Sequence, residues 1–115
     1  VAIAADIQPK HGDGVFAPFL GVPALTMTLV HRLAHRTGCK VVFCEAIRME
    51  RGQGWSLNFQ PAPESMKSES SGKAMAAFND WLSERVRAAP SQYLWIYKRF
   101  SRRPEATAPR FYPKR

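Results

Sequence analysis

Three apolar runs along the chain have the length and residue types of β-strands. Val1–Ala5 and Lys40–Ile47 are almost continuously apolar, as strands buried on both faces are. Trp55–Gln60 alternates apolar and polar positions, which predicts a half-buried antiparallel edge strand. A helical pattern lies between the first two runs, and strand–helix–strand is the order of a βαβ unit with a right-handed crossover. The pattern therefore predicts an α/β fold.

Two segments repeat their apolar residues with the period of an amphipathic helix. The first is expected to begin at Gly21-Val22-Pro23, with Pro23 near the first helical position, and to end before Gly38. Its apolar stripe contains Leu25, Leu29 and Leu33. The second helix is expected at residues 73–89, directly before Pro90, because its apolar residues fall on one face.

Polar and proline-containing segments connect these elements. The loop at residues 6–14 follows the first predicted strand, and loops at the carboxyl ends of strands are common ligand sites. Pro18 interrupts the apolar segment Val15–Leu20, which we therefore interpret as a packing loop and not as a central strand. Residues 61–72 are rich in Pro, Ser and Glu and predict an exposed, mobile linker.

The chain length of 115 residues suffices for one domain with a modest core. The predicted parts are a strand–helix–strand–strand unit at 1–60, the linker at 61–72, a helix at 73–89 and an aromatic and basic tail at 90–115. A strand buried on both faces needs neighbours on each side. Because such a strand is predicted at Val1, we expect further sequence before it.

Positive charge is concentrated at the C-terminal end. The net charge is +8, and the segment Lys98–Arg115 holds seven Lys or Arg and one Glu. A local cationic surface favours phosphate on nucleic acid, anionic lipid or a phosphorylated substrate. A solubilising tail without a binding role explains the charge equally well. Tyr93, Trp95 and Tyr97 alternate directly before these cations and predict a buried, extended anchor.

Cysteine content and hydropathy exclude several classes of protein. Cys39 and Cys44 are too few for a disulfide scaffold, and Cys44 is expected to be a small buried side chain. No run approaches the roughly 20 apolar residues of a transmembrane helix, and no signal peptide is evident. The sequence contains no Walker loop, dinucleotide fingerprint or G-x-S-x-G elbow, and we expect neither a metal nor a cofactor.

Asp6 is the first candidate for chemistry, because it stands where a predicted strand ends and a polar loop begins. A loop aspartate that caps backbone amides is the competing interpretation. His11 lies two residues from Asp13, which is weak support for a base and its orienting carboxylate. His31 and His35 are four residues apart on the predicted helix, but without a third ligand we interpret them as solvated surface residues.

Three blocks of the sequence together resemble the C-terminal half of the lipid A biosynthesis acyltransferases. The blocks are Ala5-Asp6-Ile7-Gln8-Pro9-Lys10 running into Gly14–Gly21, then Pro23-Ala24-Leu25-Thr26 with Leu33-Ala34 and Thr37-Gly38, and finally Pro90–Glu105. They occur in the family's order and cover essentially the whole chain. The resemblance implies that the chain is the C-terminal part of a single acyltransferase domain. It also implies a glycerolipid-acyltransferase-like fold with a mixed sheet flanked by helices.

The same resemblance implies an activity and its partners. The expected reaction moves a fatty acyl chain from acyl carrier protein, or a related thioester, to a hydroxyl of a phosphorylated glycolipid such as a lipid A precursor. The expected location is the cytoplasmic face of the bacterial inner membrane. Asp6 matches an active-site aspartate of the family. The candidate contacts to phosphate or an anionic membrane are Lys10, Arg48, Lys98, Arg99, Arg102 and Arg103.

One departure from the family is decisive for the chemistry. The family's general base is a His-x4-Asp/Glu motif. Here the residues five positions after the three histidines are Phe16, Arg36 and Lys40. Tyr97 also stands where relatives often have His. We therefore expect the isolated chain to be inactive.

Two other interpretations stay open. One is a basic binding module for nucleic acid or an anionic membrane, with Tyr93, Trp95, Tyr97 and Phe100 stacking on bases. The aromatic spacing fits an anchoring strand better, so nucleic acid is not the expected partner. The other is a catalytically dead domain kept for interaction.

Overall fold

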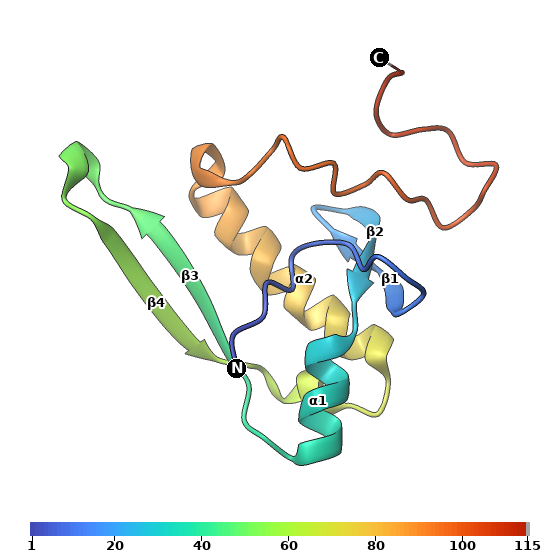
Figure 1. The fold of residues 1–115 in the computed structure, drawn as a ribbon, viewed down its shortest axis with the longest axis horizontal. Coiled ribbons are helices and arrows are strands. Elements are labelled where there is room, and N and C mark those ends of the chain that lie inside the picture. The colour runs from blue at the N-terminus through green and yellow to red at the C-terminus, as the bar shows by residue number, and fades with distance from the viewer. Residues whose placement is uncertain (115) are drawn as a thin grey trace.

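The computed structural model describes residues 1–114. Two β-hairpins and two α-helices make up the fold, together with three short 3-10 helices (Figure 1). The strands and helices are β1 (Gly14–Phe19), β2 (Val22–Met27), α1 (Leu29–Thr37), β3 (Val42–Arg48), β4 (Trp55–Pro61) and α2 (Ser71–Ala88). The 3-10 helices are η1 (Glu50–Gly52), η2 (Glu64–Lys67) and η3 (Pro90–Gln92). Within residues 1–114, no helix is both long and apolar enough to span a membrane.

The segment predicted to be a packing loop is in fact strand β1, which pairs with β2 in an antiparallel hairpin. Leu20 and Gly21 form its turn, and both have the positive φ angles that a tight two-residue hairpin needs. Pro18 lies opposite Pro23. This pair is one step beyond the hydrogen-bonded pair that closes the turn, so neither proline removes a bond from the ladder. The prolines therefore fit the hairpin, and the prediction from Pro18 was wrong.

Helix α1 is shorter than predicted. It begins at Leu29, because residues 22–27 extend as strand β2 where the sequence pattern predicted the first two helical turns. Its predicted end is confirmed: Gly38 adopts a left-handed conformation and its N–H donates to the carbonyl of Ala34.

Strands β3 and β4 form a second antiparallel hairpin, which projects from the body of the molecule (Figure 1). Both strands were predicted. The predicted half-burial of β4 was wrong, because all seven of its residues are exposed. Cys44 is also exposed, since it lies on the side of β3 that faces away from α2, and its predicted burial was wrong.

Residues 1–4 are not a strand, and only Ala5 of the first apolar run is buried. Within the described residues, β3 pairs with β4 alone, so the predicted βαβ unit does not form. The α/β class is confirmed. Both sheets have two antiparallel strands, and the parallel pairing of a mixed sheet is not found in residues 1–114.

Helix α2 is the centre of the fold and was predicted nearly in full. One core cluster joins it to β3 and η2 through Phe43, Met66 and Phe78. Met66 is 3% exposed, so the segment 61–72 packs on the core instead of being exposed throughout. A second cluster joins α2 to the β1–β2 hairpin and the tail through Phe19, Val86 and Phe100.

Polar contacts lock the β1–β2 hairpin onto α2. The Asn79 amide donates to the Thr26 hydroxyl and to the carbonyl of Ala17, and Asn79 is fully buried. The hydroxyl of Ser83 accepts from the backbone N–H of Leu20. The apolar periodicity of α2 gave no sign of these two polar side chains within its buried face.

Candidate functional site

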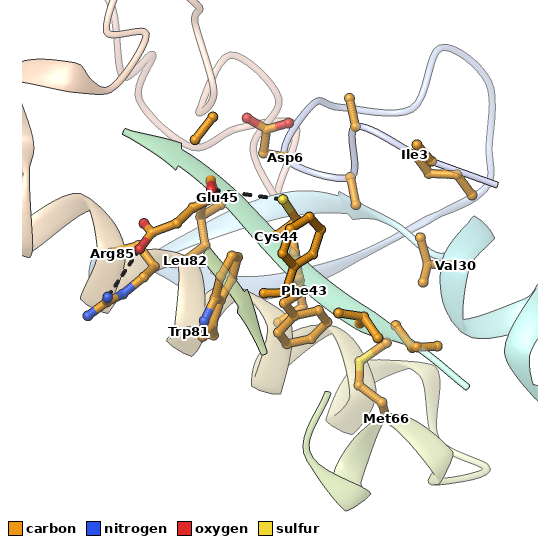
Figure 2. A pocket seen from close by; sticks show the side chains of 18 of the residues that line it. Ile3, Asp6, Val30, Phe43, Cys44, Glu45, Met66, Trp81, Leu82 and Arg85 are labelled. Carbon is orange, nitrogen blue, oxygen red and sulfur yellow. Dashed lines mark hydrogen bonds and ion pairs between the residues drawn. The ribbon is translucent and has the colours of Figure 1, made fainter. Parts of the chain in front are cut away.

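An apolar cavity of about 600 Å³ lies between the N-terminal segment, strand β3 and helix α2. Its size falls within the range of about 300–1,000 Å³ that is usual for small-molecule sites. Figure 2 shows apolar side chains from several elements around it. Those that define its wall are Ile3, Val30, Phe43, Met66, Trp81 and Leu82.

Charged groups of the cavity are few. An ion pair joins Arg85 of α2 to Glu45 of β3, with a nitrogen–oxygen distance of 3.2 Å (Figure 2). Asp6 also lines the cavity and is half-buried. Asp6 takes part in none of the ion pairs among residues 1–114. Its carboxylate therefore lies outside any ion pair on a mostly apolar wall, which Lys40 also lines.

Tyr93 lines the same cavity, and the negative charge of Asp6 affects the pKa of its phenol. Burial, together with the negative charge of Asp6, raises the pKa of the Tyr93 phenol to about 12. The phenol is therefore protonated at neutral pH and is available as a hydrogen-bond donor. Asp6 and Tyr93 thus bring an acceptor and a donor to one cavity.

The loop after Asp6 is bound to the tail by a group of hydrogen bonds. The backbone N–H of Gln8 donates to the Tyr97 hydroxyl at 2.7 Å. The Gln8 amide donates to the carbonyl of Lys98 at 2.8 Å and to the hydroxyl of Ser101 at 2.9 Å. Gln8 was not among the candidate residues, although it belongs to the first of the three sequence blocks. These contacts fix the position of Asp6 relative to the basic tail.

The structure brings the backbones of three of the six candidate cations near one another and separates the others. The Arg102 guanidinium donates to the carbonyl of Lys10, and Lys98 and Arg102 are exposed on the segment that holds Gln8. Arg48 lies at the far end of β3, where its guanidinium stacks on Trp55. Arg103 is half-buried and stacks on Phe111.

Arg99 lies inside the molecule and is only 1% exposed. Its guanidinium donates to the carbonyl of Leu25 and to the hydroxyl of Thr26, and it lies 5.8 Å from the centre of the Phe19 ring. Burial lowers the pKa of Arg99 below its ordinary value. This arginine therefore holds the tail against β2 and is not on the surface with Lys98 and Arg102.

The predicted buried, extended aromatic anchor is not formed. Residues 93–100 follow a series of turns, and Trp95 is 54% exposed. The most deeply buried residues of this segment are Arg99 and Phe100. With Phe100 buried and the Tyr97 hydroxyl bonded to Gln8, few rings are free to stack on bases.

The histidines do not form a metal site. His31 is 5% exposed, and its ring lies against that of His35, so the prediction of a solvated His31 was wrong. Its Nε2 is 2.6 Å from the carbonyl oxygen of Ser68, which ties α1 to the segment after η2. Among residues 1–114 there is no group of three His, Cys, Asp or Glu placed to hold a metal ion.

An apolar cavity with a carboxylate at its wall and a cationic segment beside it is suited to an amphipathic molecule with an anionic head. Sequence comparison identifies the family. The model of the bacterial lipid A biosynthesis acyltransferases matches residues 1–102. The chain belongs to this family.

Individual relatives are similar over most of this chain. The lipid A biosynthesis lauroyltransferase of Escherichia coli is 31% identical over 108 residues, which are 90% of this chain and 35% of that protein. The lipid A biosynthesis palmitoleoyltransferase of Escherichia coli is 30% identical over 90 residues. A lipid A biosynthesis acyltransferase of Shigella flexneri has the same identity over the same length. The chain spans about a third of the length of these relatives.

Proposed function

We propose that this chain forms the acyl-binding part of an acyltransferase. The reaction moves a fatty acyl chain from acyl carrier protein, or a related thioester, to a hydroxyl of a lipid A precursor or a similar glycolipid. The observation that carries the proposal is the apolar cavity beside Asp6 in a chain that matches the lipid A acyltransferase family over residues 1–102.

The cavity supplies the binding energy for the acyl chain. Each methylene group that moves from water into an apolar wall contributes about 0.8 kcal/mol. Phe43, Trp81 and Leu82 present such a wall. The Glu45–Arg85 ion pair lies at the cavity as well and would limit how far an apolar chain extends in that direction.

Asp6 and Tyr93 would act where the acyl chain meets the acceptor. Acyl transfer needs a base that removes the proton of the acceptor hydroxyl, and donors that stabilise the oxyanion formed from the thioester carbonyl. Asp6 can orient such a base or accept the hydroxyl hydrogen bond, and the protonated Tyr93 phenol can donate. The His-x4-Asp/Glu motif would come from further polypeptide, which would also complete a mixed, glycerolipid-acyltransferase-like sheet.

The exposed cations would bind the phosphate of the acceptor or an anionic membrane. Lys10, Lys98 and Arg102 belong to the loop after Asp6 and to the tail, which are joined by hydrogen bonds to the backbone carbonyls of Lys10 and Lys98. The Lys98 ammonium lies 5.8 Å from the centre of the Tyr112 ring. This placement suits an enzyme at the cytoplasmic face of the bacterial inner membrane, whose lipid substrate presents its phosphates to the protein surface.

A chimeric enzyme tests the proposal. In it, this chain replaces the matching segment of the Escherichia coli lauroyltransferase, and acyl transfer to a lipid A precursor is measured. Asp6→Asn should lower the rate by about 100-fold or more, the usual range for a lost acid–base group. Asp13→Asn is the control, because Asp13 is an exposed loop carboxylate paired with Arg32. Equal rates for the two variants would contradict a role for Asp6.

The isolated chain provides a second test. We expect it to leave acyl-acyl carrier protein unchanged, because none of its three histidines has Asp or Glu five positions on. Turnover by the 115 residues alone would show that the base lies within them.

A further inference from the structure

The β3–β4 hairpin has one face that turns away from α2. The antiparallel register places Val42, Cys44 and Ala46 of β3 beside the alternate residues Trp55, Leu57 and Phe59 of β4. We call these six residues the outer face. Phe43 and Glu45 point the other way, toward α2, where Phe43 packs on Trp81 and Glu45 pairs with Arg85.

The outer face is apolar and strongly exposed. The exposed fractions are 55% for Val42, 57% for Trp55, 58% for Leu57 and 67% for Phe59. None of these six residues is charged, but Arg48 lies opposite Trp55 on the same face, with its guanidinium 5.0 Å from the centre of the Trp55 ring. A contiguous apolar surface on a two-stranded sheet marks a contact surface, because such a ribbon is at best marginally stable in water by itself.

The outer face is continuous with the open side of the cavity. Val42, Cys44, Ala46 and Phe59 belong to the outer face and also line the cavity beside the N-terminal segment. Within residues 1–114, β3 pairs only with β4. On its second edge the backbone N–H and carbonyl of Arg48 are bonded to the Gln92 side chain, and the outward backbone groups of Val42, Cys44 and Ala46 are free for another strand. One covering element could therefore close the cavity, pair with β3 and bury the outer face.

We propose that the outer face and the free edge of β3 are the docking surface for further polypeptide of a lipid A acyltransferase domain. This inference rests on the proposed function and names the partner that completes its site. The matched segment is only 29–35% of the length of the relatives, so most of the polypeptide of each relative lies outside it and is long enough to supply a covering element.

Charge distribution favours a protein partner over a membrane at this face. Arg48 is the one cation on this side of the hairpin, whereas an anionic bilayer is attracted by clustered cations. The gathered cations Lys10, Lys98 and Arg102 belong to the N-terminal loop and the tail, which lie across α2 from the β3–β4 hairpin (Figure 1).

Thiol labelling of Cys44 tests the proposal directly. Cys39→Ser leaves Cys44 as the single cysteine of the chain, and its thiol is exposed on the outer face. In the isolated chain we expect a maleimide to react at the rate of an unprotected thiol. In the chimera with the lauroyltransferase, with any cysteines of the host replaced, the reaction should be at least about 100-fold slower, because the face is covered. An equally reactive Cys44 in a folded chimera would overturn the proposal.

A substitution set gives an independent measurement. The outer-face variant combines Trp55→Ser, Leu57→Ser and Phe59→Ser, and the control combines Ser56→Ala and Gln60→Ala on the other side of the same strand. The outer-face variant should leave the thermal midpoint of the isolated chain within about 3 °C, but lower that of the chimera by about 10 °C. The control should change neither by more than about 3 °C.

The remaining outcomes separate the alternatives. If the chimera does not fold, the isolated chain is mixed with the complementary part of the lauroyltransferase, and Cys44 should become protected on complex formation. The isolated chain is also tested for self-association and for binding to anionic vesicles. If either is observed and the outer-face variant abolishes it, the proposal is overturned. An inactive chimera that protects Cys44 contradicts only the proposed function, and an active chimera with a reactive Cys44 contradicts only this inference.

Discussion

Arg99 connects the tail to the fold through two hydrogen bonds, one to a backbone carbonyl and one to a side-chain hydroxyl. Leu25 lies opposite Phe16, in a pair of the β1–β2 hairpin whose backbone groups point away from the partner strand. Its carbonyl therefore depends on Arg99, and Thr26 accepts from both Arg99 and Asn79. No ion pair compensates the charge of Arg99 among residues 1–114, so these hydrogen bonds and the Phe19 ring offset its desolvation.

Replacing Arg99 by Met should destabilise the chain by about 2 kcal/mol, because the Leu25 carbonyl is left buried without a donor. The relief of desolvation keeps the loss below that of a broken buried ion pair. Urea unfolding followed by circular dichroism measures the change. Arg102→Met is the control, since Arg102 is exposed, and it should stay within about 0.5 kcal/mol. A variant Arg99→Met as stable as the control would show that the tail is not held in this way.

The raised pKa of Tyr93 predicts a loss of stability at high pH. Its pKa is raised from 10.0 in the unfolded chain to about 12 in the fold, so the folded state favours the protonated phenol. The resulting stabilisation is complete below pH 10 and is lost as the pH rises from 10 to about 12. Urea unfolding at pH 9 and pH 11 should show the decrease, and Tyr93→Phe should reduce it. An unchanged pH dependence in Tyr93→Phe would assign the decrease to other groups.

Residue-scale burial was the least predictable property. In the run Lys98-Arg99-Phe100, the pattern gave no reason for one cation to point inward and its neighbour outward. Cys44 was expected inside because apolar residues surround it in sequence. Whether a side chain of a two-sided strand is buried depends on what covers each face, and only one face of β3 is covered by α2.

At the scale of elements, two glycines with different backbone conformations give a matched prediction. Gly38 ends α1 with φ 69°, where a Cβ is strained, so Gly38→Ala should destabilise the chain by about 1 kcal/mol. Gly72 lies in the first turn of α2 without a positive φ, and an added Cβ would meet only the Ser70 hydroxyl at 3.6 Å. Gly72→Ala should therefore raise the stability by about 0.5 kcal/mol. Urea unfolding of both variants checks the sign, and a loss in Gly72→Ala would contradict it.

The elements that were predicted correctly are those whose extent is indicated by residues within or directly beside them. Helix α2 has a long apolar period with Pro90 after its end, and α1 has a glycine at its end. The β1–β2 hairpin was missed because its turn is Leu20-Gly21, without the Asn-Gly or Asp-Gly pair that usually indicates such a turn. Pro23 fits the start of a helix and the edge of a hairpin equally well. Only the pairing of Pro18 with Pro23 decides between them, and that contact is not local.

The candidate site was predictable only in part, for a related reason. The family resemblance and the position of Asp6 were readable from adjacent residues. The cavity was not, because its wall combines the N-terminal segment with β3 and α2, which are far apart in sequence. The role of Gln8 likewise depends on contacts to Tyr97 and Lys98, about 90 positions away.

At the scale of the whole molecule, α2 separates two surfaces with different properties (Figure 1). The β3–β4 hairpin presents a largely apolar face, and the tail with the loop around Gln8 presents cations. A lipid substrate with an anionic head would need both an apolar cavity and a cationic rim. Contacts at the hairpin face should therefore be weakened by substitutions of its apolar residues. Contacts at the cationic surface should be weakened by loss of charge or by added salt.

Vesicle binding distinguishes the two surfaces. The chain should bind vesicles of anionic phospholipid and release them as salt is raised, because exposed cations contribute about 1 kcal/mol each near an anionic surface. Changing Lys10, Lys98 and Arg102 together to Gln should weaken binding by roughly 100-fold. The control changes Arg36, Lys40 and Lys73 to Gln, which alters the net charge equally but at exposed positions near α1 and the start of α2. Equal weakening by both sets would show that binding follows total charge, whereas selective loss would place the membrane contact beside Asp6.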